Sequence, residues 1–91
     1  MAILIRIPSS LRKWSDDQSS LSVEARTVGE ALSRLIAIHP DLEAHVLSAS
    51  GDVPGFVNIF LNAEDIRFLH GKETLVQNGD ELSIVSAIAG G

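Results

Sequence analysis

One segment of this 91-residue chain, from Thr27 to Ile38, has the spacing of a long amphipathic helix, and strand-like segments lie on both sides of it. Thr27 and Glu30 form a capping box, in which the hydroxyl accepts from the third backbone N–H and the carboxylate reaches back. The helix is predicted to end at His39, because Pro40 pushes the residue before it out of the helical region. Apolar residues follow the cap at helical intervals: Val28, Ala31, Leu32, Leu35 and Ile36. A single substantial helix must bury this apolar stripe against something other than a second long helix.

Five short segments around the helix are predicted to be strands. Apolar and polar residues alternate in them, which is typical of strands with one buried face. The chain between the first two is a polar loop, anchored by Leu11 and Trp14, and its length favours an antiparallel hairpin. Residues 41–47 are predicted to hold only a short second helix. The five strand segments are 2–7, 20–25, 56–62, 66–68 and 81–87.

This order of elements predicts an α+β domain in which one main helix crosses one face of a mixed sheet. If the first and last strands lie side by side and parallel at the centre, the fold is a ubiquitin-like β-grasp. The pattern alone does not establish that pairing. A ferredoxin-like arrangement is the alternative, but it needs a second substantial helix, and segment 41–47 is too short for one.

Charge and composition exclude several classes of partner. The chain carries twelve acidic and seven basic residues, a net charge of −5, and the basic residues form no stripe. We therefore expect no nucleic-acid partner, although an acidic surface can steer association with a basic protein. No stretch approaches the roughly 18 apolar residues of a membrane span, and the first residues do not read as a signal peptide. The absence of cysteine rules out disulfides and fits a reducing, cytoplasmic location.

The sequence contains no recognisable catalytic or metal motif. No nucleophile and base stand at a familiar spacing, and the three histidines, His39, His45 and His70, match no compact metal-binding motif. We expect surface or capping roles for them. The chain is therefore not expected to be an enzyme, and no metal site or bound cofactor is predicted.

The sequence ends in Gly90 and Gly91, directly after an apolar segment. We expect a folded domain over residues 1–87 and a flexible tail over 88–91. Such a tail can be merely a frayed end. It can also be functional, because glycine has no Cβ and a Gly-Gly tail can carry its terminal carboxylate through a narrow channel.

The whole chain resembles the ubiquitin-like sulfur carrier proteins of the MoaD/ThiS family. The resemblance rests on "FVNIFLNAEDIRF" (56–68), "NGDELSIVSAIAGG" (78–91) and the opening "ILIRIPSSLR" (3–12). Within that family the chain looks most similar to the carriers of a cysteine-forming pathway, because of "FVNI", "EDIRF", "NGDELSI" and the final "AIAGG". The resemblance implies a β-grasp fold, in agreement with the order of elements.

The resemblance also implies a reaction cycle at Gly91. An E1-like enzyme uses ATP to convert the carboxylate to an acyl-adenylate, and a sulfur donor then displaces AMP. The product is a thiocarboxylate, with Gly91 modified to 1-thioglycine. The chain itself binds no cofactor in this cycle. It hands its sulfur to a second enzyme, such as a pyridoxal-phosphate-dependent cysteine synthase.

Partners must recognise more than the tail, and the sheet face opposite the helix is available for them. Alternation places Phe60 there, and aromatic residues on a wet strand face often mark interfaces; a covering loop is the other explanation for it. Arg6 can pair with an acidic patch on a partner or simply be solvated. The expected partner-binding residues are the tail residues Ile88, Ala89 and Gly90 and the face residues Leu4, Arg6, Phe60 and Val85.

Other destinations for the activated tail stay open. The sulfur could go to a molybdopterin precursor, a thiazole or a sulfur-containing natural product. The chain could instead be a ubiquitin-like modifier joined through Gly91 to lysines of other proteins. It could also be an interaction module with an inert tail.

Overall fold

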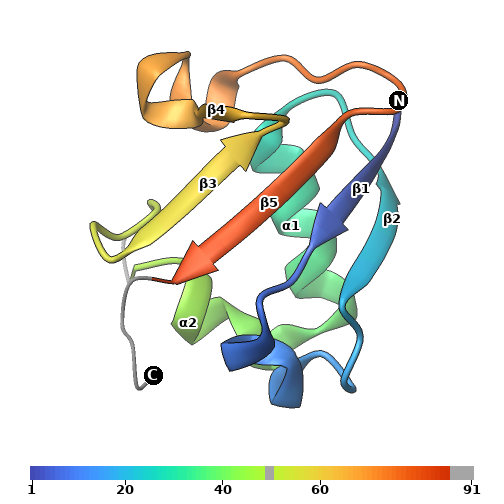
Figure 1. Ribbon diagram of the computed structural model, residues 1–91, viewed down its shortest axis with the longest axis vertical. Coiled ribbons are helices and arrows are strands. Elements are labelled where there is room, and N and C mark those ends of the chain that lie inside the picture. Colours follow the sequence, from blue (N-terminus) through green and yellow to red (C-terminus); the bar gives the residue numbers. More distant parts are fainter. Residues whose placement is uncertain (49–50, 87–91) are drawn as a thin grey trace.

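The computed structural model describes residues 1–48 and 51–86, and within them a five-stranded mixed sheet packs on one long helix (Figure 1). The strands lie in the order β2-β1-β5-β3-β4, and each pairs antiparallel with its neighbour except for β1 and β5. Their bounds are β1 Ala2–Arg6, β2 Ser20–Glu24, β3 Val57–Leu61, β4 Glu64–Asp65 and β5 Glu81–Ser86.

The central pair of strands decides the topology. β1 and β5 run parallel, with Leu4 opposite Glu81, Ile5 opposite Leu82 and Arg6 opposite Ser83. This is the pairing that the order of elements left open, and it gives a β-grasp. The ferredoxin-like alternative is therefore excluded.

The helix α1, Val28–Ile38, crosses behind the sheet in Figure 1 and starts where the capping box predicts. The Thr27 hydroxyl accepts from the Glu30 N–H at 3.1 Å, but the Glu30 carboxylate accepts from the Arg26 N–H, one residue before the expected donor. The helix ends at His39, whose backbone has left the helical region. Within residues 1–48 and 51–86, no helix combines the length and the apolar character needed to cross a bilayer.

The core lies between α1 and the inner face of the sheet. Every second residue of the longer strands points into the core. This is why apolar and polar residues alternate in the sequences of these strands. Ile5 and Leu35 have no exposed surface, and the largest buried side chains around them are Ile3, Ile7, Leu32, Leu42, Ile59 and Leu82. The core thus takes the inner face of the sheet and leaves the outer face to solvent.

Two segments differ from the sequence prediction. The expected loop contains a 3-10 helix, η1 (Ser9–Trp14), and the expected strand at 66–68 is also a 3-10 helix, η3 (Ile66–Phe68). The chain turns back early because Asn62 adopts a left-handed φ of 57°, so the returning segment pairs with β3 only through the two residues of β4. The Asp65 carboxylate then accepts from the Arg67 N–H at 2.9 Å and caps the 3-10 turn.

The second helical segment is short, as predicted, and is held by an aromatic contact. It consists of a 3-10 turn, η2 (Pro40–Leu42), and one turn of α-helix, α2 (Glu43–Val46). The ring of His45 stacks on the indole of Trp14, with centroids 3.6 Å apart, and so ties α2 to η1. A further 3-10 turn, η4 (Gly71–Glu73), packs against α1 at the other end.

Candidate functional site

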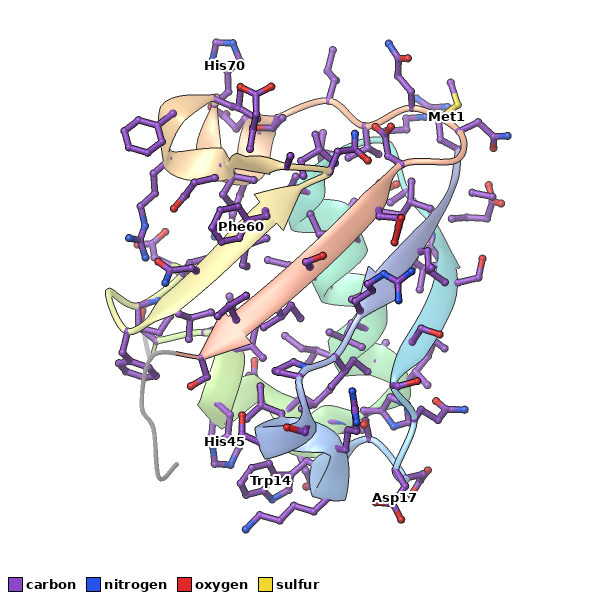
Figure 2. The ribbon with its side chains drawn as sticks, in the orientation of Figure 1. Met1, Trp14, Asp17, His45, Phe60 and His70 are labelled. Atoms are coloured by element: carbon purple, nitrogen blue, oxygen red, sulfur yellow. The ribbon has the colours of Figure 1, made fainter. Side chains whose placement is uncertain are left out.

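The sheet face opposite α1 carries a row of side chains across all five strands. The row runs through residues that pair from strand to strand: Asp65, Phe60, Ser83, Arg6 and Ser20. Figure 2 shows Phe60 in front of β3, on the side facing away from the helix. The alternation in "FVNIFLN" thus places Phe60 correctly.

Phe60 and Val85 form an apolar pair on this face. Val85 is 44% exposed, and it lies two residues along β5 from Ser83, the residue opposite Phe60. Such diagonal neighbours are about 7–8 Å apart, within reach of an aromatic ring. We call these two residues the Phe60 patch.

Leu4 and Arg6 lie on the same face but do not join the patch. Leu4 is opposite Glu81 on the far side of β5, so a whole strand separates it from Phe60. The Arg6 guanidinium forms an ion pair with the Glu81 carboxylate. Because both side chains are more than 40% exposed, the pair adds little stability, but it does engage Arg6 within the chain.

The four predicted tail residues, Ile88 to Gly91, lie outside the described residues. The described part of β5 ends at Ser86, opposite Val57 at the start of β3. Figure 1 shows that α2 lies at this end of the sheet. The described chain therefore finishes, at Ser86, at the end of the sheet beside α2.

An open groove of about 530 Å³ is present at the same end, between α2 and the segment that leads into β3. Phe56, which is 39% exposed, lines it, so an aromatic ring faces solvent one residue before β3. The other lining residues are Glu43, Ala44, Leu47, Ser48 and Pro54. We call this space the α2 groove.

The three histidines do not converge. His39 is buried and its Nε2 is 3.0 Å from the Gln18 side-chain oxygen, whereas His45 stacks on Trp14. Figure 2 places His45 and His70 at opposite ends of the molecule. In the part of the chain that the structure describes, no three His, Cys, Asp or Glu side chains come together as metal ligands do.

Sequence reasoning did not single out Phe68 and Leu75, two exposed apolar residues outside the predicted face. Phe68 is 85% and Leu75 74% exposed, because η3 replaces the expected strand and Leu75 lies in a connecting segment. Phe56 lies in the turn before β3, and only the position of α2 shows that it lines a groove. Residues next to short 3-10 turns have no periodicity that would have revealed them.

The chain has close relatives of nearly equal length. "Sulfur carrier protein CysO" of Mycobacterium tuberculosis is 36% identical over 93 residues, with all of both chains covered. "Putative sulfur carrier protein" of Archaeoglobus fulgidus is 38% identical over 94 residues, again with full coverage. "Small archaeal modifier protein 1" of Haloferax volcanii is 35% identical over 65 residues, which cover 71% of this chain and 70% of that protein.

A solved structure and a family match agree with these relatives. A chain of the Amycolatopsis orientalis BexX/CysO complex superposes with a TM-score of 0.89 at 32% identity, covering 98% of this chain and 99% of that one. Residues 5–91 match the ThiS family, and so include the Gly-Gly end. The fold, the family match and the relatives confirm the fold and the family that the sequence motifs indicated. The chain belongs to the ThiS family of ubiquitin-like sulfur carrier proteins.

Proposed function

We propose that this protein carries sulfur as a thiocarboxylate on Gly91, after an E1-like enzyme has adenylated the carboxylate with ATP. The observation that carries this proposal is the Gly-Gly end itself, which falls inside the family match. Two relatives that align along their whole length are named as sulfur carriers. The chain acts as a co-substrate of its partner enzymes and not as a catalyst.

The chemistry requires activation because a carboxylate is a poor electrophile. ATP supplies an AMP group, the acyl-adenylate forms and pyrophosphate leaves. A sulfide-level donor then forms the C–S bond while the C–O bond to AMP breaks. The product is a thiocarboxylate, whose sulfur anion is a good nucleophile, as thiolates are. The chain has no cysteine, so no internal thiol can capture the activated carbonyl.

The sulfur acceptor is proposed to be a second enzyme that takes the tail into its pocket. A pyridoxal-phosphate-dependent cysteine synthase is our first choice, since the relatives named CysO match along the whole chain. The molybdopterin, thiazole and natural-product destinations use the same thiocarboxylate. We propose that the protein works in the cytoplasm, where such enzymes and ATP are found.

The test is to incubate the protein with a purified E1-like enzyme, ATP and sulfide, and to measure its intact mass. The expected result is the exchange of one oxygen for sulfur at Gly91. A chain that lacks Gly91 should fold normally and show no exchange, because a tail buries little surface. Equal exchange in a chain extended beyond Gly91, with proteolytic trimming excluded, would refute the proposal.

A second function is favoured by the similarity to a protein named as a modifier, the Haloferax volcanii relative. In that case the activated Gly91 carbonyl is attacked by a lysine amine of another protein. Both functions begin with adenylation, and they differ only in the acceptor. Mass spectrometry of proteins from the native cell distinguishes them, because a modifier leaves isopeptide-linked Gly-Gly on lysines and a sulfur carrier leaves none.

A further inference from the structure

The α2 groove lies where a tail-binding enzyme must approach. Its wall on one side is Phe56, one residue before Val57, and Val57 is opposite Ser86, the last described residue of β5. An enzyme that takes residues 88–91 into its active site must therefore approach the end of the sheet at which Ser86 lies. The contact surface of any such enzyme either covers the α2 groove or stops at the edge of the groove.

The groove also adjoins the strand that carries the Phe60 patch. Phe56 lies in the turn directly before β3, Asn58 and Phe60 alternate along the outer side of β3, and Asn58 is opposite Val85 of the Phe60 patch. Phe56 and Phe60 are four residues apart, roughly 13 Å along a strand. An ordinary interface covers about 800 Å² on each partner, so one interface can include both aromatic residues.

The chemistry of the groove restricts what can fill it. Its lining includes three apolar residues, Ala44, Leu47 and Pro54, and on α2 it also includes Glu43, whose carboxylate is exposed. Asp41 is exposed just before α2, and no ion pair joins either carboxylate to a cation among residues 1–48 and 51–86.

Basic side chains on either side of the groove have partners within the chain. The Arg67 guanidinium donates to the carbonyls of Val57 and Gly55, at 2.6 and 3.4 Å. On the other side, the His45 ring is stacked on Trp14, whose ring also lies 4.4 Å from the Lys13 ammonium. The carboxylates on the α2 side are thus free to attract a basic group from outside.

We propose that the α2 groove is a docking site for the activating enzyme, separate from the Phe60 patch. The occupant is a segment of that enzyme that inserts an apolar side chain between Ala44 and Phe56 and places an Arg or Lys next to Glu43. This contact fixes the approach of the tail to the active site. The inference rests on the proposed function, because it assumes that Gly91 is adenylated.

Steady-state adenylation kinetics, with the carrier as the varied substrate, test the inference. Three variants alter the groove, and each has a control that makes the same change elsewhere on the exposed surface. The pairs are Phe56→Ser with Phe68→Ser, Ala44→Trp with Ala37→Trp, and Glu43→Lys with Glu73→Lys. Ala44→Trp fills the groove from an exposed helix position, so it does not depend on removing an aromatic side chain.

We expect each groove variant to raise the KM of the carrier at least about fivefold with kcat within twofold, as loss of a central anchor does. The Glu43→Lys effect should shrink at high salt, and the three controls should stay within about twofold of the unmodified chain. If the groove variants match their controls while the unmodified chain is adenylated, the inference is overturned and the proposed function stands. If the unmodified chain is not adenylated, the proposed function fails and the inference fails with it.

Discussion

Ile59 and Phe60 are neighbours in the sequence and face opposite sides of the sheet. Ile59 is 1% exposed and lies in the core, whereas Phe60 lies on the outer face in the row with Ser83 and Arg6. We predict that Phe60→Ala raises the KM for adenylation by more than about fivefold, the equivalent of roughly 1 kcal/mol of lost binding. Its loss of stability should be well below the roughly 3–5 kcal/mol of emptying a buried Phe site.

Ile59→Ala is the contrasting variant, and it should cost about 2–5 kcal/mol of folding free energy. Urea unfolding of both variants, beside adenylation kinetics, separates the two roles. A Phe60→Ala chain that unfolds as readily as Ile59→Ala would mean that Phe60 serves the core. A stable Phe60→Ala chain with unchanged kinetics would move the docking surface away from the Phe60 patch.

Gly90 lies outside the described residues, and its role follows from the proposed chemistry. A narrow channel that admits a chain without side chains should reject a β-branched residue, which is wider and stiffer. We therefore predict that Gly90→Val slows adenylation at least about tenfold and leaves the melting temperature unchanged. Gly90→Ala is the graded control. Equal rates for Gly90→Val and the unmodified chain would show a wider channel.

At the scale of elements, α1 depends on its cap. We predict that Thr27→Ala lowers stability by about 1 kcal/mol, because the Glu30 N–H loses the hydroxyl that accepts from it. For a domain of this size that is a fall of roughly 4–8 °C in melting temperature. Thr27→Ser, which keeps the oxygen, should melt close to the unmodified chain. A Thr27→Ala melting temperature equal to that of Thr27→Ser would show that the cap is not used.

The elements that the sequence predicted well are those with a strong local signal. The helix had both a cap and an apolar stripe, and β3 had clean alternation. The 3-10 helices η1, of six residues, and η3, of three, were missed because such short segments show no clear period. The sequence did contain one signal for a turn at η3. This signal is Asp65, because the carboxylate of an Asp often accepts from a backbone N–H two residues later and so caps a turn.

For the candidate site, the sequence predicted only which residues share one face of the sheet. Alternation put Arg6 and Phe60 on the same side of the sheet, but their neighbours depend on strand register. Glu81 reaches Arg6 because β1 and β5 pair in parallel, and that pairing joins residues from opposite ends of the chain. The α2 groove has the same origin, since α2 and Phe56 meet only through the packed sheet. Local patterns carry no information on such long-range contacts.

At the scale of the whole molecule, charge should govern how fast the carrier meets its enzymes. The chain has a net charge of −5 and a small body, with a radius of gyration of 11.8 Å. Long-range attraction to a basic enzyme surface is screened by salt. We predict that kcat/KM for adenylation falls as sodium chloride rises from low to moderate concentration. The Phe60→Ala chain should show the same slope, because it removes no charge; a salt-independent rate would exclude electrostatic steering.

The parallel pairing of β1 with β5 has a consequence during synthesis. A ribosome makes β1 first and β5 only after residue 80, so the middle of the sheet is vacant until then. Until β5 emerges, β1 and β3 have no strand between them, and the row from Phe60 to Arg6 does not exist. We therefore expect an activating enzyme that docks on this row to bind only chains translated almost to the tail. Prematurely terminated fragments should not present the surface and should not compete for the enzyme.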